Sequence, residues 1–218
     1  MAQKLISEVF HEHNLIKELY SEYVVNGGDG EDVLRTRVSS LGYDELFLSE
    51  CGLSSENTEL FQVSCGSGCP LRLAPDGIKE GCTILDLGSG AGHDVVLASR
   101  MVGRSGRVIG LDMTEAMINA AKENVEKYAG DENCGKVSFV CAAIDVPDDV
   151  EKHLEENVAD VVISNGVFNL CDDKKAAMLT AHRALKHGGW FLLSDVNKVE
   201  KTENAVATCS IGGDSWAN

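Results

Sequence analysis

The sequence predicts an α/β fold in which helices cover a doubly wound, mainly parallel sheet. From Cys82 onward, apolar runs of strand length alternate with longer stretches of helical spacing, which is typical of successive strand–helix–strand units. The first run, 82–87, ends in Asp86 and Leu87 and leads into a glycine-rich turn, and the second, 107–112, also ends in an acid, Asp112. Right-handed crossovers between parallel strands bring both ends to the same edge of the sheet.

The turn after the first strand has glycine at alternate positions, Gly88, Gly90 and Gly92, and a helix is expected directly behind it, over 93–102. Glycine permits positive φ and a close approach of backbone to ligand, and the free N–H groups of a helix start face the same place. A dinucleotide fingerprint would require glycine at His93. The spacing therefore favours a nucleoside with a charged tail, the alternative being a structural turn that holds no ligand.

Asp112 ends the second strand, 24 residues after Gly88. In a strand–helix–strand unit an acid at this place lies beside the first turn and accepts hydrogen bonds from both ribose hydroxyls. The alternative role is a cap for the helix expected over 114–128. The two roles are compatible, and the paired spacing favours the ribose.

The remaining elements follow in the same alternation. Strands are expected over 137–142, 159–164 and 189–195, and helices over 148–156 and 172–186. The segment Lys186-His187-Gly188-Gly189 is interpreted as the stop between the last helix and the fifth strand.

Two further strand exits carry candidate ligand-binding residues. After the third strand, Asp145 is placed to accept the adenine amino hydrogens and Ile144 to pack on the ring face, with a loop cap as the alternative role of Asp145. After the fourth strand, Asn165 and Gly166 are placed to contact the tail of the ligand through a backbone carbonyl and a side-chain amide, because ligands of open α/β sheets lie beyond the carboxyl ends of the strands.

The part of the chain before the sheet is less regular. Apolar residues at mostly helical spacing over 3–25 predict an amphipathic helix that docks on the rest of the protein. Residues 31–75 lack a strong periodicity and are expected to be irregular. The expected division is therefore 1–75 as a helical and irregular cover, 76–197 as the ligand-binding α/β domain, and 198–218 as a tail.

Composition and charge exclude several functions. The 218 residues carry a formal net charge of −16 and no run rich in Lys and Arg, which disfavours nucleic acid as a partner. No stretch approaches the roughly 20 apolar residues of a membrane span, and the N-terminus lacks the features of a signal peptide. Eight cysteines in such a chain indicate free thiols and a cytoplasmic location.

Several segments together resemble the arsenite methyltransferases, which belong to the Rossmann-like class of S-adenosylmethionine-dependent methyltransferases. The similarity covers roughly residues 60–213 and is carried by Asp86–Asp94, Ala98–Gly103, Gly110–Thr114, Val162–Leu170, Leu193–Val196, the Cys65-Gly66 turn with Pro70, and Thr208–Gly213. The elements Asn165-x-Val167-x-Asn169-Leu170 and the Cys209 segment are more specific than the glycine turn.

The resemblance implies S-adenosylmethionine as the methyl donor and a small-molecule acceptor, As(III). It implies that Asp86 and the three glycines cradle the donor and that Met113 and Ile144 cover the faces of the adenine. Cys65 and Cys209 match two thiolates that hold the arsenic during methyl transfer, in keeping with the preference of soft ions for sulfur. A third thiolate of the family follows directly after Ser164-Asn165, where this chain has Gly166.

Methyltransferases of this Rossmann-like class have two further strands after the fifth strand. The 23 residues that follow Asp195 in this chain are too few to supply these two strands. The fifth strand is therefore expected to be an exposed edge or to be covered by a partner chain. Two alternatives to arsenite methylation remain open: methyl transfer to a small organic acceptor, which the glycine at position 166 favours, and a non-catalytic donor-binding protein.

Overall fold

The computed structural model describes residues 14, 16–19, 21–22, 31–64 and 66–196. Five parallel strands form one sheet in the order β3-β2-β1-β4-β5. The strands are β1 (Thr83–Leu87), β2 (Arg107–Asp112), β3 (Lys136–Cys141), β4 (Ala159–Asn165) and β5 (Leu185–Ser194). The predicted doubly wound α/β fold is confirmed, and the first four strands lie within one residue of their predicted bounds.

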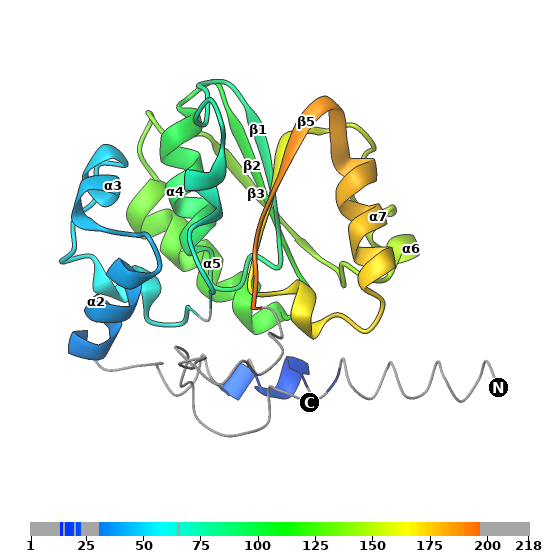
Figure 1. Cartoon of the computed structure of the whole chain (residues 1–218), viewed down its shortest axis with the longest axis horizontal. Coiled ribbons are helices and arrows are strands. Elements are labelled where there is room, and N and C mark those ends of the chain that lie inside the picture. The colour runs from blue at the N-terminus through cyan, green and yellow to red at the C-terminus, as the bar shows by residue number, and fades with distance from the viewer. Residues whose placement is uncertain (1–13, 15, 20, 23–30, 65, 197–218) are drawn as a thin grey trace, which may run out of the picture.

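Helices cover both faces of the sheet (Figure 1). On one face lie α4 (His93–Val102) and α5 (Glu115–Ala129), and on the other α6 (Pro147–Val150) and α7 (Lys174–Ala184). The central strands β1 and β4 are buried on both faces, which explains why they are continuous apolar runs rather than alternating ones.

The register places the functional residues at one edge of the sheet. Leu87 at the end of β1 pairs with Leu111 on one side and Ser164 on the other. Asn165 at the end of β4 pairs with Ser194 of β5. The chain runs outward in both directions from the β1–β4 pair, so the crevice at which such sheets bind ligands opens between these two strands.

The segment before the sheet is more regular than the sequence predicted. Residues 31–75 contain α2 (Glu31–Ser40), α3 (Glu45–Glu50) and two 3₁₀ turns, η1 (Thr58–Phe61) and η2 (Pro70–Leu73). The six-residue α3 starts at Asp44, whose carboxylate accepts a hydrogen bond from the Phe47 amide. Such short helices have little periodicity of their own and are stabilised by packing against the rest of the chain.

This segment shares a hydrophobic core with the sheet. Leu34, Phe47 and Phe61 belong to the same buried cluster as Ile84 of β1 and Val95 of α4. A second buried cluster lies on the α7 face of the sheet. Figure 1 shows α2 and α3 outside α4, on the face of the sheet opposite to α7.

Two predicted elements differ from the structure. The helix expected over 148–156 is the single turn α6, because Val150 and Leu154 are the only apolar residues of this acidic stretch and give a longer helix little packing against the core. The fifth strand begins at Leu185 rather than at 189, since Leu185 already pairs with Ala159 before the register shifts. The expected stop at Lys186–Gly189 is therefore part of β5.

In the described chain β5 is an edge of the sheet, and its Trp190 is 52% exposed. The described residues of the N-terminal segment, 14, 16–19 and 21–22, are helical, as predicted. Among the described residues we find no helix with the length and apolar character needed to cross a bilayer.

Candidate functional site

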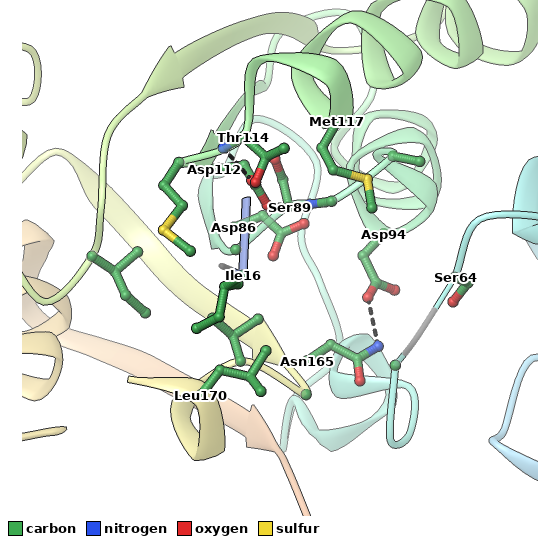
Figure 2. A pocket seen from close by; sticks show the side chains of 18 of the residues that line it. Ile16, Ser64, Asp86, Ser89, Asp94, Asp112, Thr114, Met117, Asn165 and Leu170 are labelled. Carbon is green, nitrogen blue, oxygen red and sulfur yellow. Dashed lines mark hydrogen bonds between the residues drawn. The ribbon is translucent and has the colours of Figure 1, made fainter. Parts of the chain in front are cut away.

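A pocket opens at the carboxyl edge of the sheet, between the glycine turn, the exits of β2, β3 and β4, and the segment around residue 64 (Figure 2). Its empty volume is about 860 Å³, including its side open to solvent, which is in the range of sites for small ligands and cofactors. Most predicted donor-binding residues line it: Asp86, Gly88, Gly90, Asp112, Met113, Ile144, Asp145 and Asn165.

The glycine turn is held against β2, because the amides of Gly88 and Ser89 both donate to the Leu111 carbonyl at 2.7 and 2.9 Å. All three glycines have positive φ, +77°, +50° and +81° at Gly88, Gly90 and Gly92. Their surroundings differ. A Cβ on Gly88 would lie 2.3 Å from the Val167 side chain, whereas a Cβ on Gly90 would meet nothing within 4 Å.

Gly92 lies behind the pocket wall, where a Cβ would lie 2.8 Å from the Cβ of Ala121 in α5. It precedes the first residue of α4 and has no side chain to cap the helix. The three glycines therefore serve three purposes: contact with the β4 exit, open space for a ligand, and close packing of the turn on α5.

Asp112 supports the turn and faces the pocket. Its Oδ2 accepts from the Gly90 amide at 2.9 Å and its Oδ1 from the Thr114 amide at 2.8 Å, and Figure 2 shows the contact with Thr114. Burial raises the pKa of Asp112, and these hydrogen bonds partly oppose the rise. Each carboxylate oxygen keeps further acceptor capacity, so the ribose role is compatible with the structure. The capping role is not found, because the N-cap of α5 is Thr114 and Asp112 accepts from the amide of that residue.

Asp86 differs from Asp112 in lacking such support. It is 2% exposed, and no hydrogen bond to its carboxyl group is found among the described residues. Burial, and then the charges of Asp94 and Asp112, raise its pKa well above the usual range. The Ser89 hydroxyl is likewise buried without a hydrogen-bond partner in the described chain. Such groups are costly unless something pairs with them, and a cationic ligand would pair with the carboxyl.

Asp94, in the first turn of α4, is the third acid of the pocket. Its Oδ1 accepts from the Tyr43 hydroxyl at 2.8 Å, and its Oδ2 accepts from the Asn165 amide at 2.9 Å. Burial alone would raise the pKa of Asp94, but the His93 charge and the hydrogen bonds that it accepts outweigh burial and lower the pKa. Asp94 is therefore the acid of this cluster that most readily keeps its negative charge.

Tyr43 links the segment before the sheet to this acid. Its hydroxyl also lies 3.2 Å from Nε2 of His93 and accepts a hydrogen bond from Nδ2 of Asn165 at 2.8 Å. Burial, followed by the nearby Asp94 charge, raises the pKa of Tyr43 well above 10. The hydroxyl therefore stays protonated and acts as a donor to Asp94.

The opposite end of the pocket is more apolar and contains the residues expected to surround the adenine. Met113, Ile144 and Leu170 line it together with Asp145. The Oδ2 of Asp145 accepts from the Asp172 amide at 3.1 Å, so Asp145 does cap a loop. Asp145 also lines the pocket, and its contact with adenine stays a prediction.

The structure adds pocket residues that the sequence interpretation did not single out. They are Ile16, Val63, Ser64, Asp94, Thr114 and Met117, and Val167 and Leu170 of the Asn165 motif and Cys171 line the pocket as well. Asp94 had a detectable signal, being an acid in the first turn of the helix behind the glycines. The predicted thiolate ligands, Cys65 and Cys209, lie outside the described residues. Among the described residues, no three metal-ligating side chains converge on one point.

Comparison with known proteins identifies relatives of the sheet region. A family described as "Methyltransferase domain" matches residues 78–218. Arsenite methyltransferase of Mus musculus is 40% identical over 136 residues, which cover 61% of this chain and 34% of that protein. A ubiquinone/menaquinone biosynthesis C-methyltransferase of Enterobacter sp. is 32% identical over 123 residues, 56% of this chain and 45% of that protein. The chain thus spans about a third of the mouse relative.

Among solved structures, a SAM-dependent methyltransferase from Aquifex aeolicus is similar, with a TM-score of 0.50 and 28% sequence identity. The match covers 62% of this chain and 68% of the Aquifex chain.

Proposed function

The chain belongs to the methyltransferase domain family, and on this premise we propose that it binds S-adenosylmethionine in the pocket and transfers the methyl group to As(III). The observation that carries the donor assignment is the set of three acids around one glycine turn, the buried Asp86 and Asp94 and the half-buried Asp112. S-adenosylmethionine carries a sulfonium and an ammonium group, and a buried carboxylate without a partner favours a cation.

The residues present fit this donor from end to end. The acids lie beside the turn, and the apolar end of the pocket suits a planar base. In this proposal Asp112 binds the ribose hydroxyls and Asp145 the adenine amino group, while Asp86 faces the charged tail. When bound, the donor supplies a methyl group already activated by its positive sulfur. The chain's own residues then have to orient the acceptor and exclude water.

As(III) is proposed as the acceptor from the residue pattern around Cys65 and Cys209 and from the arsenite methyltransferase relatives. The described neighbours of Cys65 support this assignment, because Ser64 and Gly66 both line the pocket. The arsenic lone pair would form the bond to the methyl carbon as the carbon–sulfur bond breaks. The electron pair of the broken carbon–sulfur bond would stay on the sulfur of S-adenosylhomocysteine.

A small organic acceptor is the second candidate, and Gly166 favours it. This residue stands where the resemblance implies a third thiolate, and its φ of +70° disfavours any side chain there. Cys171 lines the same pocket but does not replace that thiolate. Burial raises the pKa of Cys171 to about 12, and its thiol donates to the Val167 carbonyl at 3.6 Å.

Calorimetric titration with S-adenosylmethionine, repeated after addition of arsenite, tests the donor and the acceptor separately. We expect the donor and S-adenosylhomocysteine to bind, and arsenite to protect Cys65 and Cys209 from alkylation. If neither S-adenosylmethionine nor S-adenosylhomocysteine binds, the proposal as a whole is refuted. Donor binding with equal alkylation rates in the presence and absence of arsenite would refute As(III) alone. Methyl transfer to small thiols, amines or phenols would then support the second candidate.

A further inference from the structure

Residues 66–68, which follow Cys65 in the sequence, lie across the ends of β4 and β5. The Arg37 guanidinium donates to the Ser64 carbonyl at 2.6 Å, and the Ser67 hydroxyl lies 3.4 Å from the Ser194 hydroxyl. Both Ser64 and Gly66 form part of the pocket wall, with Asp94 and Asn165. Figure 2 shows the side chains of Asp94 and Asn165 joined by a hydrogen bond at this end of the pocket. The position of this segment therefore shapes the end where an acceptor would enter.

The Asn165 side chain uses its whole hydrogen-bonding capacity on protein partners. Its Nδ2 donates to Asp94 Oδ2 at 2.9 Å and to the Tyr43 hydroxyl at 2.8 Å. Its Oδ1 accepts from the backbone amides of Ser67 at 2.7 Å and Gly68 at 3.2 Å. Two donors and two acceptor positions are all that an amide side chain offers. The sequence interpretation assigned this amide to the ligand, whereas the structure pairs it with four protein groups within 3.2 Å, and the Ser67 hydroxyl lies 3.5 Å from its oxygen.

Two glycines bring the segment this close. A Cβ on Gly66 would lie 2.5 Å from Nδ2 of Asn165, and a Cβ on Gly68 would lie 2.5 Å from the Ser194 hydroxyl oxygen. Such distances are well below a normal contact, so neither position accommodates a side chain without a shift. The contact surface on β4 and β5 thus matches a bare backbone at these two positions.

We propose that Asn165 is a positioning residue that fixes residues 66–68 over the pocket and thereby sets the place of the acceptor, rather than a ligand of the methyl donor. The proposal rests on the proposed function, in that the acceptor binds beside Cys65. Asp94 and Tyr43 orient the amide from behind, and its oxygen accepts from two consecutive N–H groups. This arrangement connects the first turn of α4, the segment before the sheet and the acceptor side of the pocket.

The experiment compares Asn165→Ala with Gly90→Ala in the full chain. For each variant, hydrogen exchange is measured at the Ser67 and Gly68 amides, S-adenosylhomocysteine affinity is measured by calorimetry, and the protection of Cys65 by arsenite is measured by alkylation. We expect Asn165→Ala to speed exchange at both amides at least tenfold and to abolish the protection, with less than a tenfold loss of nucleoside affinity. Gly90→Ala should give the reverse pattern, with affinity lost and exchange unchanged.

Unchanged exchange at Ser67 and Gly68 in Asn165→Ala would overturn the proposal. A tenfold or greater loss of S-adenosylhomocysteine affinity would also overturn it, since Asn165 would then act as a donor ligand. If the wild-type chain binds no nucleoside, the proposed function fails, while the exchange rates still report whether Asn165 holds the segment.

Gly66→Ala provides a second variant that keeps Asn165 intact, in case Asn165→Ala does not fold. Its methyl group should displace the segment and speed exchange at the same two amides. In the double variant the amide atoms of Asn165, which the new methyl group at residue 66 would meet, are absent. Adding Gly66→Ala to Asn165→Ala should therefore change the exchange rates no further. Independent, additive effects of the two substitutions would contradict the proposed contact.

Discussion

Gly88 and Gly90 provide a matched pair of substitutions that separates folding from ligand binding. Both have positive φ and both line the pocket. Alanine in this backbone region costs about 1–2 kcal/mol, and this is the whole expected cost at Gly90, where a new methyl group meets no atom within 4 Å. At Gly88 the methyl group would also overlap Val167, with its nearest carbon 2.3 Å away, which adds about 1–3 kcal/mol.

Gly88→Ala should therefore destabilise the fold by about 2–5 kcal/mol and Gly90→Ala by about 1–2 kcal/mol. A destabilisation of 1 kcal/mol lowers Tm by about 2–4 °C in a chain of this size. Thermal unfolding should show a decrease of roughly 4–20 °C for Gly88→Ala and roughly 2–8 °C for Gly90→Ala. The smaller structural effect at Gly90 should accompany a loss of S-adenosylhomocysteine affinity of about tenfold or more, equivalent to 1.4 kcal/mol, because its methyl group occupies the space kept for the ligand.

The control is Val167→Ala, alone and combined with Gly88→Ala. Removal of the two γ-carbons of Val167 relieves most of the overlap and leaves the Val167 Cβ at 2.9 Å, so the double variant should be more stable than the sum of the single effects predicts. Equal Tm values for the two glycine variants, or additive effects in the double variant, would refute the steric argument. Unchanged nucleoside affinity in Gly90→Ala would refute the assignment of the open space to the ligand.

Three further outcomes are expected. The pKa of Asp86 is raised by burial and by the neighbouring acids, so at low pH the cationic donor can bind only if the Asp86 carboxyl group releases its proton. The affinity for the donor should therefore rise with pH up to the pKa of Asp86 and then level off. Asp86→Asn should flatten this profile, as calorimetry between pH 5 and 9 would show. Tyr43→Phe removes the hydroxyl that donates to Asp94 and should cost about 1–3 kcal/mol, or roughly 2–12 °C in Tm; an unchanged Tm would contradict the bridging role. With a pKa of about 12, Cys171 should resist iodoacetamide at pH 8 until the protein unfolds. The exposed Cys141 should react before Cys171, as peptide mass spectrometry would show.

The strand ends could be predicted because their signals are local. An apolar run followed by Asp86 or Asp112 predicts both the strand and the end of the strand at which the acid lies. Parallel topology then brings these strand ends to the same edge of the sheet. The same logic placed Ile144 and Asp145 in the pocket, and the structure finds both residues there.

The partners of Asn165 could not be predicted, because they are set by contacts between distant segments. Its side chain meets Tyr43 and Ser67, which precede it by 122 and 98 residues. Both partners come from the segment 31–75, whose short helices carry weak periodicity and depend on packing. A position at the tip of a strand indicates that a side chain is near the ligand, whereas the direction of its hydrogen bonds depends on the segment that covers it.

The core that α2, α3 and η1 share with α4 has a practical consequence for dissecting this protein. The family match starts at residue 78, yet Leu34, Phe47 and Phe61 lie on the other side of that boundary and are 2–4% exposed. A recombinant fragment that starts there would present the bare outer side of α4 to water and would be prone to aggregate. A fragment that contains the sheet should therefore keep the segment with α2, α3 and η1, and a protease that cuts near residue 76 should leave two pieces that stay together until denaturant is added.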